Sequence, residues 1–352
     1  MIDGSDTLRR LVLKGAGYSG LARLAQPLIG GMGAILMLHR VTARPQRPTG
    51  LNSHLAIAPT FLDALITDLK GHGHSFVTLD EAVERIAQGG GGGRFITITA
   101  DDAYRDNLTE ALPVLEKHSA PITIYVAPGL IDRSVALWWE VVEDIVNATD
   151  KLVAETPEGR LVLDCATPQA RIRAAERLQR HLTAETREEE QGAMLAAWAH
   201  AHGVDPLAPN HDLLMNWEEL EQAAAHPLVT IGAHTIHHYN LRRLDENTAR
   251  REIEGAGYIL KERLGVRPRH MAFPYGYPDA VGLRETQLAK EAGYVSAVTT
   301  RHGLLRPEHA THLQALPRIS VNGRYQELGY LRTMLSGITT ALANRGKLLV
   351  TV

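Results

Sequence analysis

Two adjacent carboxylates close an apolar stretch of the sequence. Asp101 and Asp102 directly follow FITITA (95–100), which has the composition of a buried strand. Two anions at the end of an apolar strand repel each other and lose hydration, so something must hold them there. Acidic pairs are also common as helix caps and solvated turns, and the pair alone does not decide between these structures.

A pair of histidines offers the matching chemistry. His234 and His238 follow a second apolar strand pattern, and one helical turn would put both imidazoles on the same side. Two histidines and one carboxylate are a common ligand set for a divalent metal that keeps positions open for water and substrate. Asp102 would supply the carboxylate, and Asp101 would accept a proton from the bound water. His237 is a competing ligand, since it is the i,i+3 neighbour of His234.

Strands that alternate with helices must position these residues. Apolar runs recur along the chain with helical patterns between them, which is typical of parallel βαβ units. The sequence therefore predicts an α/β fold of roughly six to eight strands, either open or closed into a barrel. In both forms the active site lies at the carboxyl ends of the strands, where the acids and histidines fall.

Three segments depart from this alternation. Residues 137–226 read mostly as charged or Ala-rich helix, and we expect them to form a helical insertion within the domain. Residues 1–33 are predicted to form an N-terminal helical segment. Residues 323–352 are predicted to form a C-terminal helical tail, an amphipathic helix that packs on the domain or contacts a membrane or a second copy.

Composition limits the possible partners and locations. The 352 residues carry a formal net charge of -3, and without a basic excess we expect no direct role in binding DNA or RNA. Cys165 is the only cysteine, so no internal disulfide can form. The first residues do not follow the order of a secretory signal. We therefore expect a cytoplasmic location, with peripheral membrane contact through the N-terminal segment as an alternative.

Three short motifs resemble one known family. TADDAYRDN (99–107) resembles the Thr-Phe-Asp-Asp-Gly/Ala motif of the polysaccharide deacetylases, which form carbohydrate esterase family 4 and share the NodB-homology domain. HTIHH (234–238) is similar to the His-Ser/Thr-x-x-His motif of that family, and FPYG (273–276) to its third motif. The order and separation of the motifs also agree, and the resemblance extends over about residues 34–322.

The resemblance implies a distorted (β/α) barrel that hydrolyses N-acetyl groups on a glucosamine-containing glycan with the help of a divalent metal, most simply zinc. Carried over by position, Asp101 is the catalytic base, and the metal ligands are Asp102, His234 and His238.

The third motif adds residues for the substrate. Pro274 and Tyr275 would line the groove, and the backbone N–H of Tyr275 would help to hold the tetrahedral oxyanion. The partner implied is an N-acetylated glycan or glycolipid. Neither its identity nor the oligomeric state follows from the sequence.

The sequence departs from the family pattern at the general acid. Most members carry a Leu-x-His motif near the C-terminus, but LQALPRISVNG (313–323) has no histidine. His39 is our candidate, because some branches have this motif on the first strand and a first barrel strand can close against the last.

Two further departures lie beside the base. Ala272 replaces an arginine that commonly holds the catalytic base, and we expect Arg318 to reach that carboxylate instead. Ala100 replaces a phenylalanine, which removes core volume next to the base.

Two other functions remain open. A glycosidase would use Asp101 and Asp102 as an acid pair, but neighbouring strand residues usually face opposite ways and the histidines would have no role. A non-catalytic glycan-binding homologue would explain the departures from the family pattern. In either case Trp138, Trp139 and Trp217 could stack on sugar faces or pack in the core.

Overall fold

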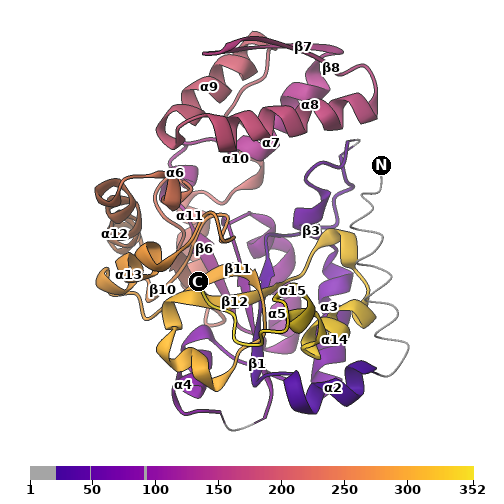
Figure 1. Ribbon diagram of the computed structural model, residues 1–352, viewed down its shortest axis with the longest axis vertical. Helices are drawn as coiled ribbons and strands as arrows, with labels where there is room; N and C mark the ends of the chain where they lie inside the picture. The colour runs from indigo at the N-terminus through magenta and orange to yellow at the C-terminus, as the bar shows by residue number, and fades with distance from the viewer. Residues whose placement is uncertain (1–20, 48, 91–92) are drawn as a thin grey trace.

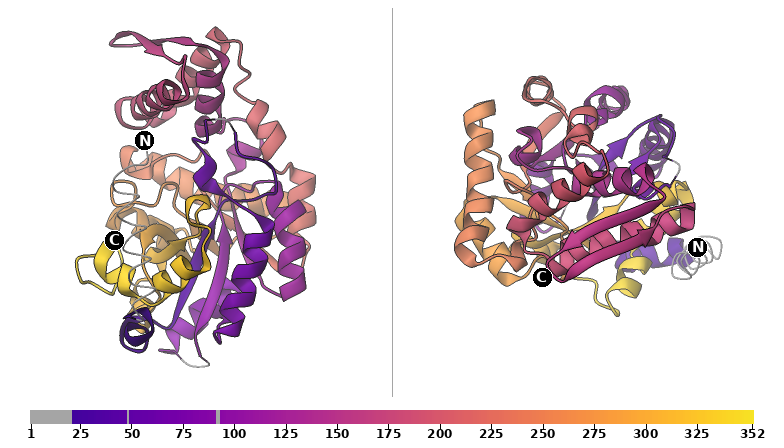
Figure 2. Two further views of the ribbon diagram at one scale, coloured as in Figure 1. Left: turned by 90° about the vertical axis from the view of Figure 1, so that its right-hand side faces the viewer. Right: turned by 90° about the horizontal axis from the view of Figure 1, so that it is seen from above.

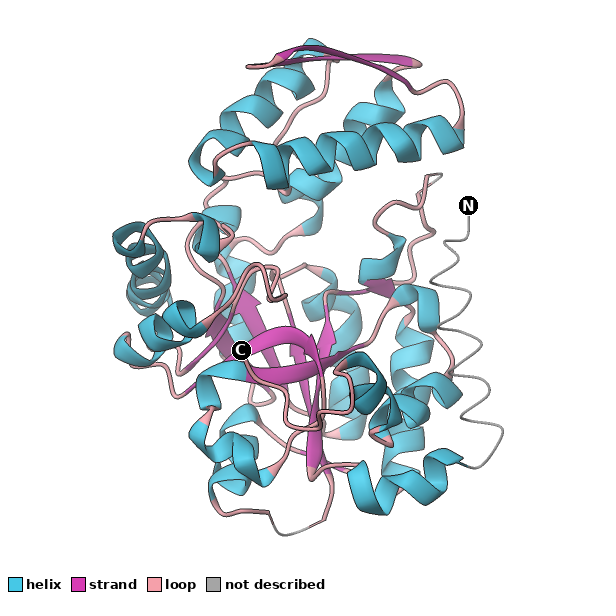
Figure 3. Ribbon diagram, in the orientation of Figure 1, coloured by secondary structure: helices cyan, strands magenta, loops and turns pink. Residues whose placement is uncertain are grey.

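A parallel barrel forms the centre of the protein. The computed structural model describes residues 21–47, 49–90 and 93–352. Within them, one eight-stranded sheet has the order β1-β12-β11-β10-β9-β6-β5-β4, and a further pairing of β1 with β5 closes every strand except β4 into a ring (Figure 3). The predicted distorted (β/α) barrel is therefore confirmed. Its strands are β1 (Gly33–Leu38), β4 (Ser75–Phe76), β5 (Phe95–Ala100), β6 (Ile122–Val126), β9 (Val229–Ala233), β10 (His270–Ala272), β11 (Ser296–His302) and β12 (Leu316–Ser320).

The register of the strands brings their carboxyl ends to one rim. Leu38 at the end of β1 is paired with Ala100 at the end of β5, and Val126 at the end of β6 is paired with Ala233 at the end of β9. Every residue of β1, β5 and β6 is buried, because one face lines the barrel interior and the other lies under helices. Residues that follow these strands therefore meet at one end of the barrel.

Helices surround the barrel on its outer side (Figure 1). The longest begins after Asp245, whose side chain accepts a hydrogen bond from the N–H of Thr248, and ends at Gly265 with a φ of 79°. The outer helices are α3 (Pro59–Gly71), α4 (Leu79–Ala87), α5 (Leu112–His118), α11 (Trp217–Ala224), α12 (Glu246–Leu264) and α13 (Leu283–Glu291). A short parallel pair, β2 (Arg40–Val41) and β3 (Ala56–Ile57), follows the first barrel strand.

A large insertion covers the carboxyl end of the barrel. It leaves after β6 and returns in α11 and β9. It lies across the top of the molecule in Figure 1 and in the left view of Figure 2. Val142, Leu178 and Trp198 belong to a hydrophobic cluster of its own. Its elements are α6 (Pro128–Ile131), α7 (Trp138–Ala148), β7 (Lys151–Thr156), β8 (Gly159–Asp164), α8 (Pro168–Arg180), α9 (Glu188–Ala201) and α10 (Ala208–Leu213).

The insertion, predicted to be mostly helical, also contains two strands that were not predicted. β7 and β8 form an antiparallel hairpin. Leu152 and Ala154 alternate with exposed or half-buried neighbours and are themselves fully buried. This period of two is the strand signal that the surrounding helical patterns concealed.

The first helix of the described chain contacts its last two helices. Helix α2 (Leu21–Ile29) contacts α14 (Leu328–Leu335) and α15 (Ile338–Ala343). The predicted tail helix is broken in two at Gly337, which has a φ of 89°. Of the predicted N-terminal helical segment, residues 1–20 lie outside the described residues. No helix in the described part of the chain combines the length and apolar character needed to cross a bilayer.

We predict that Gly232→Ala lowers the free energy of unfolding by about 1–3 kcal/mol. Gly232 lies in β9, where an added Cβ would overlap the buried ring of Tyr125. Urea denaturation would measure the change. Gly192→Ala is the matched control, because a Cβ on this residue of α9 meets no atom within 4 Å. There we expect a gain of about 0.5–1 kcal/mol from the loss of glycine flexibility. Equal effects of the two changes would contradict this packing.

Candidate active site

Asp101 forms a closed ion pair with Arg318. The N–H of Asp101 donates to the carbonyl of Leu38 at 3.0 Å, which continues the pairing of β5 with β1 beyond the strand end. The guanidinium of Arg318, from β12, donates to both carboxylate oxygens of Asp101 at 2.7 and 2.8 Å. Both side chains are buried. The structure thus places Arg318 where the sequence predicted, against the carboxylate that lacks its usual arginine partner.

Two threonines fix this arginine. Its Nε donates to the carbonyl of Thr299 at 2.9 Å, and one terminal nitrogen also donates to the hydroxyl of Thr99 at 3.2 Å. Burial raises the pKa of Asp101, but the charge and hydrogen bonds of Arg318, together with His234 and His39, lower it by more, and the carboxyl titrates well below its ordinary value of 3.8. Asp101 is therefore an anion at neutral pH, held in one orientation by a bidentate pair.

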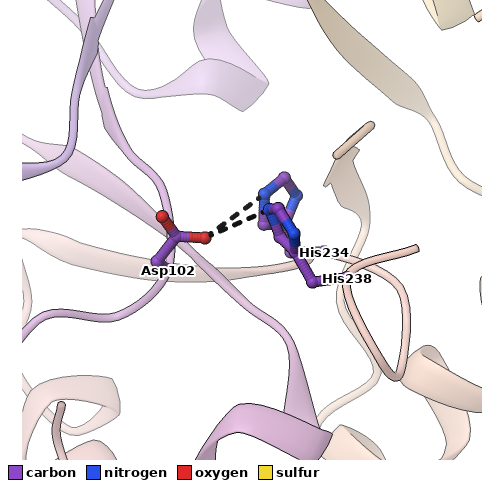
Figure 4. Close-up of side chains that lie close together, drawn as sticks. All are labelled: Asp102, His234 and His238. Atoms are coloured by element: carbon purple, nitrogen blue, oxygen red, sulfur yellow. Dashed lines mark ion pairs between the residues drawn. The ribbon is translucent and has the colours of Figure 1, made fainter. Parts of the chain in front are cut away.

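Asp102 faces two histidines instead. Its Oδ1 lies 3.6 Å from Nε2 of His234 and 3.5 Å from Nε2 of His238 (Figure 4). One potential ligand atom from each of the three side chains lies within 4.8 Å of the others. The structure thus brings together the three residues predicted as metal ligands.

At least two of the three atoms that converge here are hydrogen-bond acceptors. Nδ1 of His234 lies 2.8 Å from the carbonyl of Ala272, so Nδ1 carries the proton and the lone pair of Nε2 faces Asp102. Burial lowers the pKa of His234, and burial together with His234 lowers that of His238 much further, so both imidazoles are neutral. Oδ1 of Asp102 is buried without a hydrogen-bond donor among the described residues. A shared cation would satisfy all three side chains at once.

The distances between these ligand atoms also fit a small divalent ion. Two zinc bonds of about 2.1 Å at the tetrahedral angle separate their donor atoms by about 3.4 Å, close to the 3.5 and 3.6 Å observed. Burial and then the charge of Asp101 raise the pKa of Asp102 well above 3.8. The ionised form of Asp102 therefore needs a positive charge beside it. Arg318 cannot supply that charge, because it is already paired with Asp101.

Unusual backbone conformations concentrate around these side chains. Residues other than glycine rarely adopt a positive φ, and they do so where the surrounding structure holds them, often at functional sites. At the barrel rim φ lies between 53° and 70° at Asp102, Ala103, Thr235, His238 and Tyr275. The turns that carry the acids, the histidines and the third motif are thus all held in uncommon shapes.

Glu252 on α12 holds the histidine turn and was not predicted. Its Oε2 accepts hydrogen bonds from the N–H groups of Ile236 and His237 at 3.0 and 2.9 Å. Its Oε1 lies 2.6 Å from Nδ1 of His237. His237 is therefore turned toward the helix, which separates it from the ligand pair that includes His234. The sequence contains no signal that distinguishes Glu252 from the other acids of this helix.

Aromatic rings from the insertion form a wall beside the ligands. The ring centroid of Trp139 lies 5.2 Å from that of His238. Trp138 stacks on Tyr275 at 6.5 Å, and its indole N–H donates to the tyrosine hydroxyl at 3.2 Å. Trp217 lies apart from this wall, since its indole donates to Asp132.

The third motif forms a tight turn after β10. The N–H of Gly276 donates to the carbonyl of Pro274 at 2.7 Å, and the hydroxyl of Thr300 donates to the carbonyl of Tyr275 at 2.7 Å. The N–H of Tyr275 donates to no acceptor among the described residues. Because the ring of Tyr275 lies 5.2 Å from that of His238, this free donor belongs to the same rim as the metal ligands.

His39 lies at the end of β1, half-buried at the same rim. Its carbonyl accepts a hydrogen bond from the side-chain amide of Asn107 at 3.0 Å, and its ring makes no hydrogen bond within the described residues. Burial lowers the pKa of His39 to about 4, opposed by Asp101 and reinforced by Arg318. The imidazole is therefore neutral at pH 7 and has an unused nitrogen.

Comparison with known sequences agrees with this arrangement. The sequence profile described as "Polysaccharide deacetylase" matches residues 88–156 and 189–297, together just over half of the chain. The chain belongs to the polysaccharide deacetylase family. The unmatched residues between these segments cover β8 and α8 of the insertion. No curated protein sequence matches the chain.

Solved structures of other proteins share the fold. The deacetylase PplD of Streptococcus pyogenes, solved in complex with acetate, is 17% identical, with 86% of this chain and 97% of that chain covered and a TM-score of 0.57. IcaB of Ammonifex degensii is 18% identical, with 87% and 97% covered and a TM-score of 0.54. The BpsB deacetylase domain of Bordetella bronchiseptica is 16% identical, with 83% and 96% covered and a TM-score of 0.50.

We predict that the purified deacetylase binds one zinc ion per chain and that His234→Ala loses it. Removal of one of three ligands leaves too few donors to hold the ion. Metal analysis after dialysis against zinc would measure the stoichiometry. His237→Ala is the control, since His237 bonds to Glu252, and it should keep the full stoichiometry. Full occupancy in His234→Ala would contradict the ligand assignment.

Proposed function

We propose that this protein is a metal-dependent hydrolase that removes acetyl groups from N-acetylglucosamine residues of a glycan. The observation that carries the proposal is the convergence of Asp102, His234 and His238 beside an ionised carboxylate. Family membership supports de-N-acetylation of a polysaccharide. Acetate, which occupies the related fold of PplD, is the product that such a reaction would release.

The roles of the residues follow from their positions. A divalent ion, zinc in our proposal, would be held by Asp102, His234 and His238, would polarise the acetyl carbonyl and would make the attacking water more acidic. Asp101 accepts the proton of that water, and Arg318 keeps Asp101 ionised and oriented for this step. The N–H of Tyr275, free among the described residues, donates to the carbonyl oxygen as negative charge develops there.

His39 completes the proton balance. The leaving nitrogen must gain a proton when the C–N bond breaks, and His39 is neutral at pH 7. The pKa of Asp101 lies well below that of His39. Transfer of a proton from Asp101 to the imidazole of His39 is therefore favourable. His39 then gives it to the departing amine. One water and one amide become acetic acid and a free amino sugar, the acid then releases its proton to solvent as acetate, and both side chains return to their first state.

The wall of the site suits a sugar ring. The stacked rings of Trp138 and Tyr275 offer an apolar face with polar tips, which matches the C–H face and hydroxyls of a pyranose. We therefore propose an N-acetylated glycan or glycolipid as substrate. The cytoplasmic location and the peripheral membrane contact stay predictions from the sequence.

The geometry disfavours the two other functions. A glycosidase would need one acid of the pair to hold a proton for the leaving oxygen, whereas Arg318 closes both oxygens of Asp101. The second acid faces the histidines.

A homologue without turnover would not need an ionised carboxylate held beside a complete ligand set, although the replacements Ala100 and Ala272 motivate that alternative. Arg318 supplies the arginine partner of Asp101 that Ala272 cannot provide.

We predict that Asp101→Asn keeps its zinc and loses acetate release by several hundred-fold or more, because the amide cannot accept the proton of the water. Acetate release from a panel of N-acetylated glycans, before and after removal and return of zinc, would measure this. An unchanged rate in Asp101→Asn would remove the base from the mechanism. Shortened sugar chains in place of acetate would identify a glycosidase.

His39→Gln should show a loss that depends on the leaving group. We expect about a hundred-fold lower kcat on an N-acetyl sugar, whose amine must be protonated, and less than about fivefold on an aryl acetate, whose phenolate leaves without a proton. Asp101→Asn serves as the comparison, since the base is needed for both substrates. Equal losses of His39→Gln on both substrates would contradict its role as the general acid.

A further inference from the structure

The first motif continues beyond the acid pair as AYRDN (103–107), and the proposed mechanism uses none of these residues. Asp106 and Asn107 are both buried. A π-helical turn begins at Asn107 and ends at Ala111, directly before α5. Such turns are rare, and they are frequent at functional sites. Two buried polar side chains at the start of this turn need hydrogen-bond partners.

The segment that carries His39 supplies these partners. The side-chain amide of Asn107 donates to the carbonyl of His39 at 3.0 Å. Asp106 accepts hydrogen bonds from the two residues that follow His39. The donors are Nε of Arg40 at 2.9 Å and the N–H of Val41 at 3.1 Å. Two adjacent residues of the first motif thus hold three successive residues of the chain after β1.

A third side chain of the turn extends this contact. The two carboxylate oxygens of Glu110 accept hydrogen bonds from the hydroxyl of Thr42 at 2.8 Å and from the N–H of Ala43 at 2.6 Å. Residues three apart on a helical turn are neighbours, so Glu110 and Asn107 share one side of it. Each of residues 39–43 therefore bonds to this side. We refer to Asp106, Asn107 and Glu110 as the clamp.

The bond to His39 is the specific contribution of Asn107. Its side chain makes one hydrogen bond among the described residues, and its buried Oδ1 makes none. A buried amide that is only partly satisfied costs stability, so packing alone gives no reason for an asparagine here. What this side chain supplies is a donor for the carbonyl of His39.

The imidazole of His39 has little other support. His39 lies in the bend between β1 and β2, outside both strands. Its ring makes no hydrogen bond within the described residues, so the place of the ring depends on the backbone that carries it. The clamp begins five residues after Asp101 in the same stretch of chain. It therefore joins the backbone of the general acid to the segment that carries the base.

We propose that Asn107 is a positioning residue, which sets the place of the His39 imidazole relative to the base Asp101 while Asp106 holds the next two residues of the segment. The inference rests on the proposed function, in which His39 is the general acid. An acid must lie within hydrogen-bond reach of the leaving nitrogen, and a misplacement of about 1 Å can cost a hundred-fold in rate. Asn107 acts only through His39.

A double-mutant cycle in the full-length zinc-loaded protein tests this role. We expect Asn107→Ala to lower kcat for acetate release from a tetramer of N-acetylglucosamine at least about tenfold, with KM within about twofold of wild type. Introduced into His39→Gln, the same change should cost less than about twofold in kcat, because the residue through which it acts is gone. Losses that multiply in the double variant would overturn the proposal.

Thr109→Ala is the matched control. Thr109 is exposed in the same π-helical turn, and its hydroxyl donates to the carbonyl of Arg105 at 3.3 Å instead of to residues 39–43. The kcat of this variant should stay within about twofold of wild type. A loss as large as that of Asn107→Ala would show that any disturbance of the turn slows the reaction, which would overturn the specific role of Asn107.

A second variant guards against misfolding of Asn107→Ala. Asn107→Leu keeps a branched side chain of similar shape but has no donor for the carbonyl of His39, and we expect the same loss in kcat. A thermal melt and a stoichiometry of one zinc ion per chain would show that each variant is folded. A folded Asn107→Leu with the kcat of wild type would overturn the proposal.

Crystal structures separate this inference from the proposed function. In zinc-loaded Asn107→Leu, the ring of His39 should lie more than about 1 Å from its place in wild type, with Asp101 still paired with Arg318. An unmoved ring would overturn the inference and leave the proposed function intact. No acetate from the tetramer with wild type would contradict the proposed function, whereas a displaced ring would still support the clamp.

Discussion

The ion pair between Asp101 and Arg318 decides what the barrel rim can do. Two neighbouring carboxylates buried at the end of a strand cannot both stay ionised unless each finds its own positive charge. Arg318 gives both of its terminal nitrogens to one of them. The other, Asp102, is left facing two neutral imidazoles with an oxygen that has no donor in the described structure. The ion pair therefore keeps the base Asp101 ionised. It also leaves Asp102 and the two histidines without a positive charge, which a bound cation would supply.

The rest of the fold serves this separation of roles. Parallel strands with aligned carboxyl ends bring the acids, the histidines and the third motif to one rim. Turns with positive φ aim the side chains, and Glu252 fixes the turn that carries His234 by binding two of its N–H groups. The insertion contributes Trp139, whose ring lies against that of His238. The added segment thus contacts the metal ligands.

Much of this arrangement could be predicted from the sequence, and the exceptions have physical reasons. Strand ends and ligand types are local, so the α/β class and the convergence of Asp102 with the histidines followed from pattern and spacing, whereas the closed barrel followed from the family resemblance. Arg318 could be chosen because Ala272 left a carboxylate without its usual partner. Glu252 could not be chosen from the sequence, because nothing in the sequence distinguishes it from the other acids on its helix. Its role depends on the turn that packs against it. The β7–β8 hairpin escaped notice since its strands are short and lie among long helical patterns, and the break at Gly337 depends on packing against α2.

The most direct test is the position of the bound metal in crystals of the zinc-loaded protein, from an anomalous difference map at the zinc absorption edge. The account predicts one peak at about 2.0–2.2 Å from a ligand atom of each of three residues, namely Asp102, His234 and His238. It also predicts that Asp101 remains paired with Arg318. A peak bonded to Asp101, or one that lacks either histidine, would contradict the separation of the two acids into a base and a ligand.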